Sequence, residues 1–221
     1  MVERITAEDR TPDDGYTIIE VIVSIGIFTL FVAMMLTTVV AISQSSIRTQ
    51  LVGESTNGAI TVFGALDRQA RYSDSINYPG TGANGKRFVE FRTPAESAAT
   101  RVTTCTQWMF NPTEMTMSSR TWPDQAGSTA TPWVVRLNNV IDDQLPGSPY
   151  PFTLVPAGYM GPSMQQLVVS LHAGNAALDG DAQFASSFVA RNSSIRSPSN
   201  EDTDGNLVSD FPVCARIGSR S

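Results

Sequence analysis

A single carboxylate stands at the edge of a long uncharged segment. Glu20 precedes residues 21–42, VIVSIGIFTLFVAMMLTTVVAI, and none of those 22 residues carries a charge. A carboxylate in a membrane-spanning helix costs roughly 2.5–3.5 kcal/mol at the bilayer centre and less near its edge, so such a group usually has a partner. No Lys, Arg or His lies within one helical turn of Glu20. We therefore expect the partner to be a cation on another chain or an amino group made by cutting this chain nearby.

The residues just before Glu20 favour the second source. A cut after Gly15 would make Tyr16 the new N-terminus and Glu20 the fifth residue of the mature chain. The cationic α-amino group at the tip of one helix could then pair with Glu20 on a neighbouring helix. The pattern thus predicts a contact between chains rather than a catalytic group.

The stretch GYTIIE (residues 15–20), followed by the apolar run, resembles the cleavage and methylation signature of type IV prepilins and pseudopilins. Three features coincide: a glycine before an aromatic residue, a glutamate at the fifth mature position, and a membrane-length run. The resemblance covers roughly residues 15–45. Within the family, SIGIF (24–28) and LDRQARYSDSI (66–76) are similar to the larger minor pseudopilins of the J type.

The resemblance implies a role for each matching residue. A prepilin peptidase would cut between Gly15 and Tyr16 and methylate the amine of Tyr16, and Glu20 would neutralise that amine on an adjacent subunit of a fibre. It implies as partners other pilin subunits, the peptidase, an assembly platform protein with its ATPase, and the membrane. The chain is then a structural subunit, a minor pilin or pseudopilin of a type IV pilus or a type II secretion-like fibre, and not an enzyme. The alternative is a single-pass, membrane-anchored extracytoplasmic binding or receptor module that is neither processed nor polymerised.

The apolar run is long enough to stay in the membrane. A helix needs about 20 residues to cross the bilayer core, whereas the apolar part of a signal peptide has about 7–15. Arg4 and Arg10 on the N-terminal side favour an N-terminus inside the cell and a cell-surface or extracytoplasmic location for the rest. The net charge of −6 and pI of about 4.7 do not indicate nucleic acid as a partner.

The elements that position these residues can be read from the remaining pattern. No proline occurs between Pro12 and Pro79, and an apolar stripe with helical spacing predicts one helix from about residue 17 to about residue 73; the stripe consists of Ala59, Phe63, Leu66 and Ala70. The glycine-rich stretch 77–86 predicts a loop. After it, alternating patterns predict strands at 86–93, 101–110, 114–122, 132–141, 164–173 and 182–192, of which the second and third form a hairpin.

The predicted fold class is α+β, with a long pilin-like N-terminal hydrophobic helix whose C-terminal half packs on a mainly antiparallel sheet. The expected organisation is a leader peptide (1–15), a transmembrane and assembly helix (16–43), a helix continuing into the globular domain (44–75) and a β-rich extracytoplasmic domain (76–221).

One interpretation of residues 200–211, NEDTDGNLVSDF, is a calcium-binding loop. Asn200, Asp202 and Asp204 fall at ligand positions 1, 3 and 5 of a calcium loop, and Gly205 falls at the glycine position. Position 12, where a bidentate glutamate is needed, holds Phe211. The other reading is an Asp-Gly hairpin turn with solvated acids and no cofactor.

The two cysteines, Cys105 and Cys214, form either a disulfide or two buried free thiols. An extracytoplasmic domain permits the disulfide, and closing a loop of about 110 residues would contribute nearly 5 kcal/mol in the chain-entropy model.

No catalytic constellation is found. The stretch PGTGANGKR resembles a phosphate-binding loop, but Arg87 follows Lys86 where a Ser or Thr is required, and the order of the flanking elements is reversed. The only histidine, His172, has no acidic neighbour in the sequence, so we expect a packed or surface side chain. We expect Trp108, Trp122 and Trp133 to serve packing rather than binding.

Overall fold

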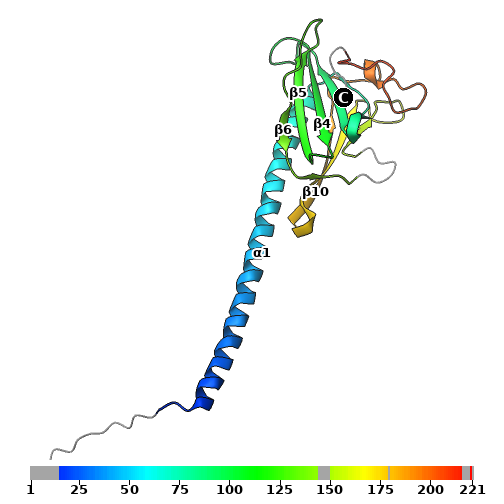
Figure 1. Cartoon of the computed structure of the whole chain (residues 1–221). Helices are drawn as coiled ribbons and strands as arrows, with labels where there is room; N and C mark the ends of the chain where they lie inside the picture. Colours follow the sequence, from blue (N-terminus) through cyan, green and yellow to red (C-terminus); the bar gives the residue numbers. More distant parts are fainter. Residues whose placement is uncertain (1–14, 144–149, 179, 216–219, 221) are drawn as a thin grey trace, which may run out of the picture. The chain divides into compact units, whose positions relative to one another are not determined.

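The computed structural model describes residues 15–143, 150–178, 180–215 and 220. The predicted leader, residues 1–15, lies outside the described residues except for Gly15. Two compact units are present, one ending at Ser46 and one covering Ile47–Ser221. The expected α+β architecture, a long apolar N-terminal helix packed against antiparallel sheets, is confirmed (Figure 1).

Helix α1 spans Ile18–Arg71, close to the range expected from the absence of proline. At its C-terminal end, groups outside the helix donate hydrogen bonds to its last carbonyls. The Ser73 hydroxyl donates to the Ala70 carbonyl at 2.6 Å, and the Arg191 N–H donates to the Arg71 carbonyl at 3.1 Å. The last carbonyls of a helix have no partner within it, so these bonds fix both the end of α1 and its attachment to the C-terminal part of the chain.

The first sheet, sheet A, contains six strands, all antiparallel. Its order is β1 (Ser75–Ile76), β3 (Arg87–Thr93), β4 (Thr104–Asn111), β5 (Thr116–Pro123) and β6 (Val134–Leu137), and β2 (Gly80–Thr81) also pairs with β3. The predicted β4–β5 hairpin is confirmed. At its turn, the side-chain oxygen of Asn111 accepts the N–H groups of Thr113 and Glu114, which is the local bonding that makes Asn a turn residue.

The second sheet, sheet B, is built around β9. It has β10 (Gly180–Val189) on one side of β9 (Gln166–Asn175), and β7 (Val140–Ile141) and β8 (Phe152–Val155) on the other. Short 3₁₀ turns occupy Ala83–Gly85, Ala176–Leu178 and Pro198–Asn200.

The prediction of one strand over 132–141 is wrong. That stretch forms β6 in sheet A and β7 in sheet B, because Asn139 takes the left-handed φ of 56° and turns the chain between them. The chain thus passes from one sheet to the other within a few residues.

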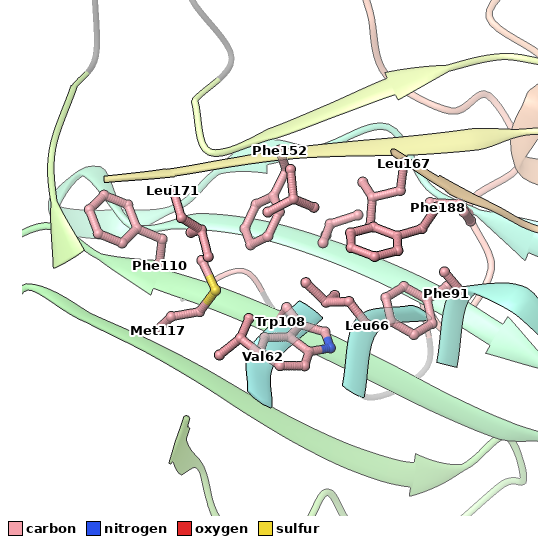
Figure 2. Close-up of a cluster of buried hydrophobic side chains, with 14 of the residues drawn as sticks. Val62, Leu66, Phe91, Trp108, Phe110, Met117, Phe152, Leu167, Leu171 and Phe188 are labelled. Atoms are coloured by element: carbon pink, nitrogen blue, oxygen red, sulfur yellow. The ribbon is translucent and has the colours of Figure 1, made fainter. Parts of the chain in front are cut away.

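The main hydrophobic core lies between the two sheets and the second half of α1. Figure 2 shows Val62 and Leu66 of α1 beside Trp108 of sheet A, with side chains of sheet B above them. The Trp108 indole N–H donates to the Gln69 side-chain oxygen at 2.8 Å, so the buried ring keeps its hydrogen bond. The fully buried members of this core include Val89, Phe91, Phe110, Met117, Phe152, Leu167, Val169 and Leu171.

We predict that Leu66→Ala lowers the free energy of unfolding by about 2–5 kcal/mol, because it leaves a cavity between α1 and the sheets. Ile60→Ala on the same helix is the matched control, since Ile60 is 62% exposed; it should change stability by about 0.5 kcal/mol or less. Urea unfolding of the full chain in detergent, followed by tryptophan fluorescence, measures both. Equal effects would contradict this placement of the core.

Candidate functional site

The predicted cleavage and assembly residues at the N-terminal end of α1 are exposed to solvent. Gly15, Tyr16 and Thr17 precede the helix, which begins at Ile18. Tyr16 is 82% exposed, and Glu20 is also exposed in the first turn. The bond between Gly15 and Tyr16 therefore lies in non-helical, accessible backbone.

Thr17 caps this end of the helix. Its hydroxyl oxygen accepts the backbone N–H of Glu20 at 3.3 Å, and its carbonyl accepts the N–H of Val21 at 3.2 Å. Thr at the cap with Glu three residues later is a capping-box sequence, and a carboxylate there also suits the positive end of the helix dipole. The pattern T-x-x-E, residues 17–20, is the signal in the sequence that predicts this cap. Glu20 thus takes part in the cap through its backbone N–H, while its carboxylate lies at the favourable end of the helix dipole.

Helix α1 carries an extended apolar surface between Ile18 and Ile42. Apart from half-buried Val32, its large apolar side chains are 44–80% exposed in the single chain. The hydroxyls of Thr29, Thr37 and Thr38 donate to helix carbonyls, which satisfies them without water. Among the described residues, α1 is the helix with the length and composition to cross a membrane, and such a helix is compatible with a membrane anchor.

A disulfide joins Cys105 of β4 to Cys214, with their Cα atoms 5.7 Å apart. The bridge is buried against Trp122 and Val213. It fastens the C-terminal segment to sheet A, and it leaves no thiol available as a nucleophile.

The acidic loop after Asn200 differs from the predicted ligand set. Asn200 is turned to another segment: its side-chain oxygen accepts the Ala157 N–H at 2.8 Å, and its amide donates to the Ala157 carbonyl at 2.9 Å. The carboxylates of Asp202 and Asp204 instead gather with that of Asp210, with one oxygen of each within 4.8 Å of the others. Oxygen ligands of this kind suit Ca²⁺. Calcium binding stays a prediction, and the carboxylate that lies with Asp202 and Asp204 is that of Asp210 and not the side chain of Asn200.

The same carboxylates also hold the loop in shape. Asp202 accepts the N–H groups of Asn206 and Leu207, both at 3.0 Å. Asp210 accepts the N–H and the hydroxyl of Thr203 at 2.9 and 2.7 Å. These hydrogen bonds lower the pKa of Asp210 below its ordinary value.

His172 has two acidic neighbours that its sequence context did not reveal. Its Nδ1 lies 2.7 Å from an oxygen of Asp143, and its Nε2 lies 2.6 Å from an oxygen of Asp181. These residues come from different strands or their ends, so only the pairing of β7, β9 and β10 brings them together.

The remaining polar cluster lies beside the glycine-rich stretch. Glu90 of β3 is buried and accepts hydrogen bonds from Arg220, Gln107 and Asn77. The Arg220 side chain occupies the space next to Gly80, in the stretch that resembles a phosphate-binding loop. Gly80 pairs with β3 rather than cradling a ligand.

The tryptophans are engaged in packing. Trp108 and Trp122 are buried, and Trp133 stacks against the Arg120 guanidinium, which lies 4.3 Å from the ring centroid. Burial lowers the pKa of Arg120 from its ordinary value.

Comparison of the chain with models of protein families, with curated proteins and with solved structures gave no significant match. The geometry described above and the sequence pattern at the N-terminus therefore carry the functional argument.

We predict that Asp210→Asn loosens the acidic loop, because the amide is a weaker acceptor than the carboxylate for the two Thr203 donors. Since folding lowers the pKa of Asp210, its contribution is present above pH 3.8, the ordinary value, and is lost as the pH falls through the lowered pKa. Hydrogen exchange at the Thr203 amide should be faster in the variant at neutral pH. Glu201→Gln, a neighbouring exposed acid, is the control and should leave the rate unchanged.

Proposed function

We propose that this chain is a structural subunit of a type IV pilus or type II secretion-like fibre, a minor pilin or pseudopilin. The proposal rests on the position of the cleavage pattern at the start of a long uncharged helix. The stretch GYTIIE, with its Gly–Tyr bond and its glutamate, lies at the accessible start of a helix whose next 22 residues are uncharged. That helix then continues into an α+β unit.

The proposed mechanism begins with removal of residues 1–15 by a prepilin peptidase. The new α-amino group of Tyr16 stays cationic after methylation, and Glu20 of an adjacent subunit neutralises it. The apolar surface between Ile18 and Ile42 leaves the bilayer and packs against the same surface of other subunits. The energy for extraction comes from a separate cytoplasmic ATPase acting through an assembly platform protein.

The exposed apolar surface supports an environment of lipid or other helices. In water it would be an unusually large apolar patch, because monomeric soluble proteins rarely expose more than a few hundred Å² of contiguous apolar surface. A membrane-anchored binding module would bury it equally well in lipid. The two functions differ at Gly15 and Glu20: a fibre subunit needs both, whereas an anchored module needs neither.

We predict that the protein from its host begins at N-methylated Tyr16, because the peptidase cuts after Gly15. Mass spectrometry of the N-terminal peptide, with and without the host's prepilin peptidase, tests this. The mature peptide should disappear in the strain without the enzyme. A chain that retains residues 1–15 in cells with active peptidase would exclude the fibre subunit in favour of the anchored module.

We predict that Glu20→Gln yields a cleaved subunit that stays in the membrane. The variant keeps the size of the side chain and loses the charge that pairs with the Tyr16 amine. Its abundance in sheared fibres should fall about tenfold or more, since 1.4 kcal/mol corresponds to a factor of ten and an unpaired charge in lipid costs more than that.

Thr17→Val tests the helix cap separately from the Glu20 charge. It removes the hydroxyl that accepts the Glu20 backbone N–H and leaves the carboxylate in place. If charge pairing between subunits is the main role, this variant still enters fibres, provided that mass spectrometry shows normal cleavage. Equal loss with both variants would mean that the structure of the helix start, and not charge pairing, decides entry into fibres.

A further inference from the structure

His172 lies at the centre of sheet B, where three elements meet. It is on β9, its backbone pairs with Gln183 of β10 and with Ile141 of β7, and its side chain is 11% exposed. Asp181, on β10, contacts one ring nitrogen at 2.6 Å. Asp143, two residues beyond the end of β7, contacts the other at 2.7 Å. One imidazole therefore joins both flanking elements to the central strand.

This arrangement favours a charged imidazole. The Nε2 atom of His172 forms a hydrogen bond with the Asp181 carboxylate, whereas Nδ1 lies 2.7 Å from an Asp143 oxygen as an ion-pair contact without hydrogen-bond geometry. A neutral imidazole has one N–H donor and one lone pair, whereas the imidazolium carries a proton on each nitrogen. In the neutral form one lone pair would face an anionic oxygen, which is repulsive. The positive charge of the imidazolium attracts both carboxylates.

Among the described residues, the charged groups beside the two carboxylates have contacts of their own. The Arg87 guanidinium of β3 forms a bidentate ion pair with the Asp142 carboxylate, with N···O distances of 2.7 and 2.9 Å. The Tyr150 hydroxyl donates to the Ile141 carbonyl and accepts the His172 backbone N–H, so it braces the same strands. Burial raises the pKa of Tyr150 to about 12, which keeps it neutral over the physiological range. The imidazole is thus the group that contacts both Asp143 and Asp181 in the described residues.

We propose that Asp143, His172 and Asp181 form a proton-operated clamp on sheet B. With the proton bound, the clamp holds the end of β7 and strand β10 to β9; as the pH rises and the proton leaves, both contacts weaken together. The clamp lies in the unit Ile47–Ser221 and needs neither the cleavage at Gly15 nor the assembly of a fibre.

The direction of the pH effect follows from linkage. Burial by itself lowers the pKa of His172, but the contacts with Asp143 and Asp181 outweigh it, and the pKa in the folded protein is raised above 6.5. A raised pKa means that the proton stabilises the fold. This stabilisation is fully present below about pH 6.5 and is lost as the pH rises through the higher value of the folded state.

The test uses the full chain in detergent micelles. Because His172 is the only histidine, selective labelling gives a single imidazole signal, and its NMR titration reports this residue alone. We expect a pKa above 6.5. Hydrogen exchange measured on both sides of that pKa, and corrected for the base-catalysed rate of free amides, should show loss of protection in β7 and β10. Strands β4 and β5 of sheet A are the internal reference and should not change.

Asp181→Asn should lower the pKa of His172 and abolish the pH-dependent change in β10. Asp124→Asn changes the net charge equally, outside the clamp, and should behave as the parent chain. The wild-type titration does not depend on either variant folding. The proposal is overturned if His172 titrates at or below 6.5, or if β7 and β10 respond to pH no more than β4 and β5 do.

Discussion

The unbroken helical backbone from Ile18 to Arg71 makes one element serve two environments. Between Val21 and Ile42 its side chains are uncharged, mostly apolar and, apart from Val32, exposed, and its backbone groups are satisfied within the helix, which is what a lipid or helix-bundle environment requires. From Ser55 onward the same backbone presents a narrow stripe of buried residues, of which Val62, Leu66 and Ala70 belong to the main core. A change of hydrophobic pattern, rather than a break in secondary structure, separates the two roles.

The C-terminal part of the chain depends on side-chain hydrogen bonds because it forms no strand after Val189 in the described residues. Buried backbone groups without a strand partner need another one. Serine hydroxyls supply it: Ser197 donates to the Asp74 carbonyl, Ser199 to the Ile76 carbonyl, and Ser209 to the Ser199 carbonyl. Together with the disulfide, these contacts hold an irregular segment against sheet A. This explains why serine is buried here although it usually lies on a surface.

Patterns local in sequence could be predicted, and contacts between distant residues could not. Helix α1 and the β4–β5 hairpin follow from periodicity and turn residues, and the structure contains both. Strand β8 was missed, because it is a short run whose position comes from pairing with β9. The environment of His172 depends on Asp143 and Asp181, which lie 29 and 9 residues away in the chain and meet only through strand pairing. Asn200 matched a ligand pattern, but the loop that contains Ala157 lies beside it and takes up its side chain.

The position of Glu20 can be weighed energetically. A carboxylate in the first turn gains about 0.3–1 kcal/mol from the helix dipole, whereas its cost in lipid rises to roughly 2.5–3.5 kcal/mol at the bilayer centre. The helix dipole alone can therefore offset the cost of placing the Glu20 carboxylate in lipid only while this end of the helix stays near the membrane surface.

Removal of residues 1–15 would change this balance, because it places a cationic amine at the positive end of the same helix dipole. That amine is unfavourable on its own helix and needs a carboxylate, while Glu20 needs a cation. In the proposed fibre, pairing between neighbouring helices would meet both demands, because each charge would compensate the other away from water. In the proposed assembly, cleavage therefore creates the partner that Glu20 lacks in the sequence, and the same pair that makes burial of the helix ends tolerable also fixes the offset between adjacent subunits.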